Sequence, residues 1–181
     1  MSTPHALNYL LGRGISLEVI QRFRIGWNGH RLTFPMRGGL LKTRPAHDGA
    51  QMKNWPGKER EWPLYPNVSR DASWVLLAAG ELDALCGLSV GLPACSVTLG
   101  AGTWRDAWTD ELRGLYVAVC FDTNEAELAE RRVSELRAAG IRARHLDLRT
   151  LGLAEPKGDL SDYLNSGGDP KRLKPPGRGT P

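Results

Sequence analysis

Strand-like and helix-like segments alternate over the second half of this 181-residue chain, and this alternation constrains the fold most. Residues 74–79 (WVLLAA) and 115–122 (LYVAVCFD) are nearly continuous apolar runs, as in parallel strands buried on both faces. Further strands are expected at 94–100 and 141–148. Helices are expected at 81–91, 104–114 and 125–140, the last ended by Gly140. The alternation predicts an α/β fold with a parallel sheet and helices on both faces.

The first 70 residues have a different pattern. Residues 6–24 predict two short helices broken around Gly12 and Gly14, with Ser16 as the N-cap of the second. Short strand-like pieces follow from residue 31 to residue 55, with turns at Gly38–Gly39 and Asp48–Gly49. A small α+β subdomain is therefore expected before the parallel sheet.

Charge divides the chain in the same way. Residues 1–70 hold 11 Lys/Arg and 4 Asp/Glu, whereas residues 71–170 hold 9 Lys/Arg and 16 Asp/Glu. We predict a basic N-terminal subdomain at 1–70, an α/β domain at 71–168 and a flexible basic tail at 169–181. The basic part could hold a polyanion while carboxylates of the acidic part hold metal ions. The alternative is that both charged faces are solvated surfaces.

Several classes of protein are disfavoured by the sequence. No apolar run approaches the ~20 residues of a membrane-spanning helix, and the first residues lack the apolar stretch of a signal peptide. Cys86, Cys95 and Cys120 are odd in number and widely spaced, unlike a disulfide framework or a zinc ribbon. We expect a soluble cytoplasmic protein without a membrane partner.

Acidic side chains follow three of the predicted strands. Because the carboxyl ends of parallel strands meet at one edge of the sheet, these side chains are expected to share a site. Carboxylates that close repel one another unless a cation neutralises them, and their hard oxygen atoms favour Mg²⁺ or Mn²⁺. The alternative is that each residue caps a helix. The residues are Glu81 and Asp83, then Asp122 and Asn124, then Asp159 and Asp162.

The order of these segments resembles the Toprim domain shared by primases, topoisomerases and some nucleases. The resembling stretches are VLLAAGELDAL, VTLGAG, VAVCFDTNEAE and KGDLSDYL. The earlier stretches NYLLGRGISLEVIQRFRIG, RLTFPM, LLKTR and KNWPG resemble the segment that precedes Toprim in bacterial-type replicative primases, including those of phages, plasmids and other mobile elements. The resemblance covers roughly residues 6–168. It implies a Toprim fold, a Rossmann-like parallel sheet with helices on both faces.

The resemblance implies template-directed RNA primer synthesis during DNA replication, by metal-dependent nucleotidyl transfer on single-stranded DNA. The partners would be the template, nucleotides and a helicase or polymerase. The catalytic residues would be Glu81, Asp83 and Asp122, and the ligands of Mg²⁺ or Mn²⁺ would be Asp122, Asn124, Asp159 and Asp162. Arg31 and Arg44 match basic positions of the family, and Lys53 matches with a shift of one residue, so these residues would contact nucleic acid. The neighbouring charges Lys42, Lys58 and Arg60 do not match family positions but are expected to contact it as well. Exposed rings of Trp55 and Trp62 could stack on unpaired bases, although packing is favoured for Trp55.

Two positions depart from the family pattern. Ala79 stands where the catalytic glutamate belongs, and Asn124 replaces the second aspartate of the Asp-x-Asp motif. Ala79 could be an engineered substitution, a natural loss in a domain retained for binding, or a loss compensated by Glu81. Two alternatives to a primase therefore stay open. One is a Toprim nuclease, and the other is a degenerate nucleic-acid-binding module that assists a separate polymerase or helicase.

Overall fold

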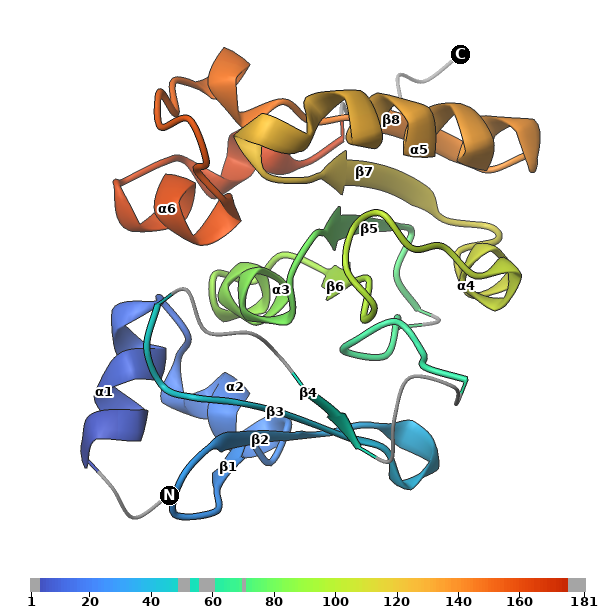
Figure 1. Cartoon of the computed structure of the whole chain (residues 1–181). Coiled ribbons are helices and arrows are strands. Elements are labelled where there is room, and N and C mark those ends of the chain that lie inside the picture. Colours follow the sequence, from blue (N-terminus) through green and yellow to red (C-terminus); the bar gives the residue numbers. More distant parts are fainter. Residues whose placement is uncertain (1–3, 49–52, 56–60, 70, 176–181) are drawn as a thin grey trace.

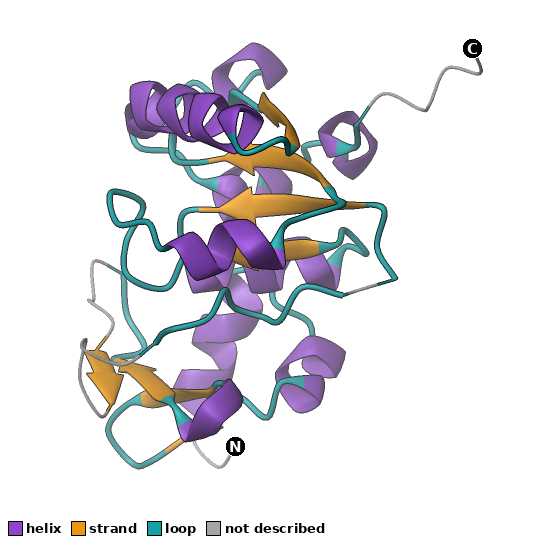
Figure 2. Cartoon of the chain, turned by 90° about the vertical axis from the view of Figure 1, so that its right-hand side faces the viewer, coloured by secondary structure: helices purple, strands orange, loops and turns teal. Residues whose placement is uncertain are grey.

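The computed structural model describes residues 4–48, 53–55, 61–69 and 71–175, which form two four-stranded sheets (Figures 1 and 2). One sheet has the strand order β1-β2-β3-β4, and the other has the order β6-β5-β7-β8. Among the described residues, no helix combines the length and apolar character needed to cross a membrane.

The second sheet is parallel throughout, as the sequence predicts. Its strands are β5 (Trp74–Ala78), β6 (Ala94–Ser96), β7 (Tyr116–Cys120) and β8 (Arg142–His145). The helices are α3 (Glu81–Ser89), α4 (Asp106–Glu111), α5 (Ala126–Ala138) and α6 (Leu160–Asn165). Short 3₁₀ turns are η2 (Thr123–Glu125), η3 (Leu148–Leu151) and η4 (Pro170–Leu173). The strands and the first three helices confirm the predicted alternation, and α6 is an addition to it.

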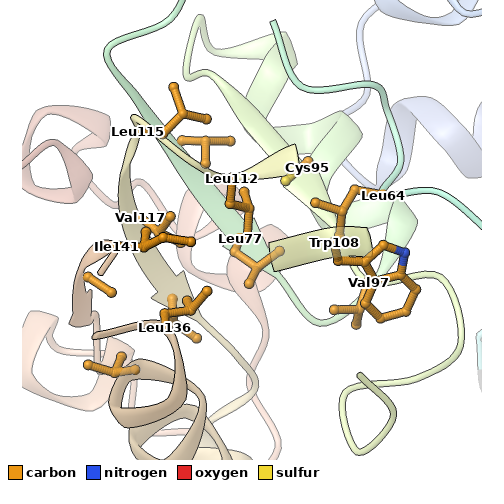
Figure 3. Packing of buried hydrophobic residues seen from close by; sticks show 14 of the residues in the cluster. Leu64, Leu77, Cys95, Val97, Trp108, Leu112, Leu115, Val117, Leu136 and Ile141 are labelled. Carbon is orange, nitrogen blue, oxygen red and sulfur yellow. The ribbon is translucent and has the colours of Figure 1, made fainter. Parts of the chain in front are cut away.

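Successive residues of β5 explain how the sheet is covered. Val75 and Leu77 belong to a core cluster with residues of α4 and α5, drawn in Figure 3. Leu76 and Ala78 point to the opposite face and pack in a second cluster with residues of α3 and α6. Because both faces bury apolar side chains, the strand reads as a continuous apolar run. The predicted covering of both faces is confirmed.

The N-terminal part is a small α+β unit. It contains α1 (Pro4–Gly12), α2 (Leu17–Arg22), β1 (Gly26–Trp27), β2 (Leu32–Pro35), β3 (Leu41–Arg44) and β4 (Lys53–Trp55). Its strands pair antiparallel. The Ser16 side chain accepts a hydrogen bond from the backbone of Val19, which confirms the predicted N-cap. Gly38 and Gly39 have positive φ angles in the turn η1 (Arg37–Gly39) between β2 and β3, as expected.

Helix α3 joins the two parts, because it lies between the parallel sheet and the N-terminal elements (Figure 1). Its residues Leu82, Leu85 and Cys86 belong to the same buried cluster as Leu10 and Ile15 of the N-terminal part. The opposite side of the helix faces the sheet. The packing is therefore continuous across residue 70, where the sequence predicts a division.

Two expectations about single segments are wrong. The first concerns the tail at 169–181, which was expected to be flexible. Leu173 is fully buried, and the Arg144 side chain donates hydrogen bonds to the carbonyl groups of Leu173 and Lys174, so the tail is ordered at least to Lys174. The side chain of Asp169 caps this turn, a local signal that the basic composition hides. Trp62 is only 1% exposed, and its carbonyl accepts a 2.6 Å hydrogen bond from Trp108. Its ring is part of the core and cannot stack on a base.

Candidate functional site

A cleft of about 420 Å³ opens at the carboxyl end of β5, between the parallel sheet and the N-terminal part. It receives side chains from α1, β3, α3 and the start of α6, so both parts of the chain build it. Its lining contains both cations and carboxylates. The lining residues are Tyr9, Arg13, Arg44, Asp48, Gly80, Glu81, Leu82, Asp83, Lys157, Asp159 and Asp162.

The end of α1 aims Arg13 into this cleft. The helix ends at Gly12, whose carbonyl accepts a hydrogen bond from Asn165 of α6. Gly14 follows with a φ angle of +76°, and a Cβ atom there would lie 2.5 Å from Asn165 Oδ1 and 2.9 Å from Cys86 Sγ. Only glycine combines this backbone conformation with such a close approach. The glycines thus bring the chain against α3 and α6 with Arg13 on the cleft side.

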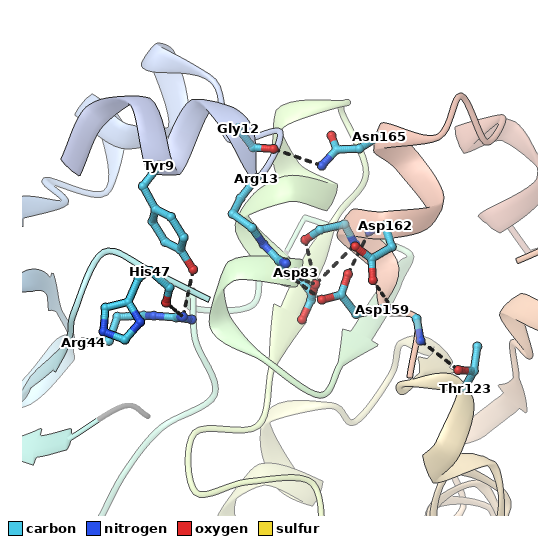
Figure 4. Close-up of polar contacts among 12 residues, drawn as sticks. Tyr9, Gly12, Arg13, Arg44, His47, Asp83, Thr123, Asp159, Asp162 and Asn165 are labelled. Atoms are coloured by element: carbon cyan, nitrogen blue, oxygen red, sulfur yellow. Dashed lines mark hydrogen bonds and ion pairs between the residues drawn. The ribbon is translucent and has the colours of Figure 1, made fainter. Parts of the chain in front are cut away.

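Arg13 pairs with two of the predicted acidic residues (Figure 4). Its Nη2 atom lies 2.5 Å from Asp159 Oδ2 and 3.6 Å from Asp83 Oδ1. All three side chains are at most 21% exposed, so solvent screens the pairs weakly. The two carboxylates raise the pKa of Arg13, although burial opposes this rise. The structure therefore brings Asp83 and Asp159 together around a cation of the chain itself.

Asp83 is a buried acid of the cleft. Burial, together with the nearby charge of Asp159, raises the pKa of Asp83 to about 7. Hydrogen bonds from the Ser161 backbone (3.3 Å) and hydroxyl (2.7 Å) oppose that rise, as does Arg13. The Asp83 carboxyl thus holds the start of α6 against the start of α3.

Asp159 and Asp162 form a capping box at the start of α6. Asp159 accepts a hydrogen bond from the Asp162 backbone at 2.8 Å, and Asp162 accepts one from the Asp159 backbone at 3.1 Å. Both carboxylates also line the cleft. These two residues therefore cap α6 and also belong to the shared site, so the two interpretations of the sequence are compatible for them.

Asp122 and Asn124 follow β7 and take different positions. Burial raises the pKa of Asp122 to about 7, and the charges of Glu125, Asp159 and Asp162 add to this effect. Asp122 is thus an electrostatic neighbour of the cleft acids. Asn124 is exposed and lines a separate cavity of about 720 Å³ beside α5. The structure does not bring Asn124 to the cleft as the proposed metal ligand requires.

Glu81 and Lys42 form a buried ion pair across the two parts of the chain. The Lys42 ammonium also donates to the carbonyl of Thr98, and both charged side chains are at most 6% exposed. This geometry corrects the expectation that Lys42 contacts nucleic acid, because Glu81 neutralises the charge of Lys42 inside the protein. It also directs Glu81 towards Lys42. Ala79 packs beside the core cluster that covers the other face of the sheet.

The other predicted nucleic-acid residues are spread over the N-terminal sheet. Arg44 lies in the cleft, where its Nη2 atom donates to Tyr9 (2.8 Å) and to the carbonyl of His47 (3.0 Å). Arg31 donates to the side chain and carbonyl of Thr43. Lys53 is exposed on β4. Lys58 and Arg60 lie outside the described residues.

Arg13, Tyr9, Asp48 and Lys157 line the cleft but are absent from the predicted site. Arg13 lies within the primase-like GRGIS stretch, between two glycines, so the resemblance contained a signal for it. Tyr9 precedes it by about one helical turn on α1. Lys157 opens the Toprim-like KGDLSDYL stretch, so the resemblance contained a signal for it as well. Asp48 was marked only as a turn residue.

The predicted acids that line the cleft do not fit a divalent metal ion. Arg13 pairs with Asp83 and Asp159, the capping box engages Asp162, and Lys42 neutralises Glu81. Within the described ranges, no three His, Cys, Asp or Glu side chains are grouped as a metal site requires. Asp122 and Glu125 are not ion-paired with any described residue, and the Glu125 Oε2 atom is buried without a hydrogen-bond partner among these residues. These two carboxylates do not line the cleft.

Solved primase structures have the same fold. The zinc-binding and RNA polymerase domains of the Aquifex aeolicus primase match with a TM-score of 0.68 at 16% identity, over 95% of this chain and 55% of that chain. This chain thus spans about half the length of that chain. A chain from the bacteriophage T7 lagging-strand DNA polymerase interacting with primase domains, bound to an RNA/DNA hybrid and dTTP, matches with a TM-score of 0.54 at 18% identity. That match covers 86% of this chain and 84% of the other.

No family model matches the sequence, and no curated protein matches it significantly. The likeness to primases is therefore one of fold. The chain has a primase-type Toprim fold preceded by the small basic α+β unit, as the sequence predicts.

Proposed function

We propose that this protein acts in DNA replication as a primase-like protein that binds single-stranded DNA in the cleft. The observation that carries the proposal is the position of the cleft, where cations of the N-terminal part meet the strand-end acids of a primase-type fold. Arg44 at the cleft and exposed Lys53 on the neighbouring strand form the side that would contact phosphate groups.

A binding role is favoured over a catalytic one by two features. The glutamate expected at the end of β5 is Ala79, and Glu81 is held by Lys42 rather than directed to replace it. A helicase or polymerase that supplies the chemistry would suit such a module. The T7 structure contains a polymerase together with primase domains, which is consistent with a replication partner.

Binding can be tested by fluorescence anisotropy with labelled single-stranded DNA over a range of salt concentrations. Phosphate contacts release counterions, so the logarithm of the affinity should fall linearly with the logarithm of the salt concentration. A salt-independent affinity, or no saturable binding, would refute the proposal. Shortening of the labelled strand with Mg²⁺ present would instead identify the Toprim nuclease.

Template-directed primer synthesis is the second candidate, favoured by the acids Asp83, Asp122, Asp159 and Asp162 that the fold keeps near one edge of the sheet. It would require Mg²⁺ or Mn²⁺. Labelled-nucleotide incorporation on single-stranded DNA should be compared between the unsubstituted chain and Ala79→Glu. We expect no primers from the unsubstituted chain. Primers made by it would establish the enzyme, and primers made by Ala79→Glu alone would show that Ala79 inactivates it.

A further inference from the structure

The acids of the cleft are balanced by cations that belong to the chain. Arg13 reaches Asp159 at 2.5 Å and Asp83 at 3.6 Å (Figure 4). It follows the end of α1 and precedes Asp159 by 146 residues in the sequence. A guanidinium between two carboxylates offsets the repulsion that otherwise calls for a metal ion. The position between Asp83 and Asp159 is therefore occupied by a protein group.

Hydrogen bonds from the start of α6 engage one oxygen atom of each of these two acids. Asp83 Oδ1 accepts hydrogen bonds from the backbone and hydroxyl groups of Ser161, while Asp159 Oδ1 accepts one from the backbone of Asp162. A divalent ion at Asp83 and Asp159 would have to displace Arg13 and weaken the cap of α6. Each loss of a charge-assisted hydrogen bond opposes metal binding.

The Lys42–Glu81 pair extends the same arrangement. Its buried ammonium neutralises the acid nearest to the vacant glutamate position, Ala79. Releasing Glu81 to a metal ion would leave the Lys42 charge buried without its partner, which is strongly unfavourable.

We propose that Arg13 acts as the resident cation of this cleft and keeps divalent metal ions from Asp83 and Asp159. Removal of the guanidinium uncovers a site for one Mg²⁺ or Mn²⁺ ion. The inference rests on the geometry of the acids and is independent of the proposed binding of DNA.

The test is a titration of Mn²⁺ followed by electron paramagnetic resonance, in which the signal of free Mn²⁺ falls when the ion binds. The proteins are the full natural chain, Arg13→Gln, the charge-conserving Arg13→Lys and the control Arg22→Gln, whose exposed side chain lies on α2. We expect a loss of signal equivalent to about one ion per chain for Arg13→Gln. The other three proteins should leave the signal as in buffer.

Stoichiometric Mn²⁺ binding by the natural chain would overturn the proposal, as would a folded Arg13→Gln variant, verified by circular dichroism, that binds no Mn²⁺.

A second measurement, of the melting temperature, needs no variant. An ion that binds the folded state raises the melting temperature. The natural chain should melt at the same temperature with and without Mg²⁺ at matched ionic strength, and a rise would contradict the proposal. Because no DNA is present, neither result bears on the proposed function.

Discussion

The N-terminal unit and the parallel-sheet domain differ in both topology and charge, and their contacts show how the difference is used. The first is antiparallel and basic, and the second is parallel and acidic. Cations of the first pair with carboxylates of the second at Arg13–Asp83, Arg13–Asp159, Arg37–Glu111 and Lys42–Glu81. Part of the charge asymmetry therefore holds the two units together. Among the described residues, cations outside these pairs, such as Arg44 and the exposed Lys53, remain available to a polyanion.

The largest effect is expected at the buried pair between the units. Lys42→Met leaves the Glu81 carboxylate buried without a cation, which should lower the free energy of unfolding by about 3–5 kcal/mol. Urea denaturation measures this change. The double variant Lys42→Met/Glu81→Leu should recover most of the loss, since an apolar pair can replace a buried ion pair. The exposed Lys53→Met on the next strand serves as control. If Lys42→Met lowers the free energy of unfolding no more than Lys53→Met does, the ion pair does not hold the units together.

A smaller effect is expected where α1 meets α3 and α6. Gly14 has a left-handed backbone, and a Cβ atom there would lie close to Asn165 and Cys86. Gly14→Ala should therefore lower the free energy of unfolding by about 1–2 kcal/mol or more. Gly12→Ala is the matched control, because a Cβ atom there meets no atom within 4 Å. Urea denaturation of both variants distinguishes a docking constraint from a general cost of replacing glycine. Equal stabilities would exclude the constraint.

The acidic unit should make stability depend on pH. The folded state raises the pKa of Asp83 to about 7, above its value in the unfolded chain, so the folded state binds more protons between about pH 4 and pH 7. The free energy of unfolding should therefore fall as the pH rises through this window, with a smaller slope in Asp83→Asn. Asp122 contributes in the same direction. The exposed Asp71→Asn should keep the natural slope. An unchanged slope in Asp83→Asn would contradict this assignment.

The smallest effect concerns the basic unit alone. Arg44→Gln should lower the free energy of unfolding by only about 1 kcal/mol, because the hydrogen bonds to Tyr9 and His47 are lost. It should weaken the binding of single-stranded DNA at all sequences. The salt slope should decrease by about one, because one phosphate contact is lost. Anisotropy titrations at several salt concentrations give both quantities. Arg22→Gln, on the exposed side of α2, should retain the natural slope. Equal slopes for the two variants would place DNA outside the cleft.

The sequence predicts the elements better than it predicts their contacts. Leu76 and Val117 lie in apolar runs, and such runs predict strands that are buried on both faces of a parallel sheet. The burial of Lys42 cannot be predicted from the sequence, because its partner Glu81 lies 39 residues away and on another element. Arg13 was likewise visible as part of a motif but not as the partner of Asp83. Leu173 was missed because one apolar residue in a basic segment gives no periodicity.

The most direct test of a DNA-binding cleft is the affinity of the natural chain for labelled single-stranded DNA, measured by anisotropy in EDTA and then in Mg²⁺ at matched ionic strength. We predict saturable binding of equal affinity under the two conditions, falling steeply as salt is added. Binding that requires Mg²⁺, or no binding under either condition, would contradict a cleft that holds DNA with the cations of the chain itself.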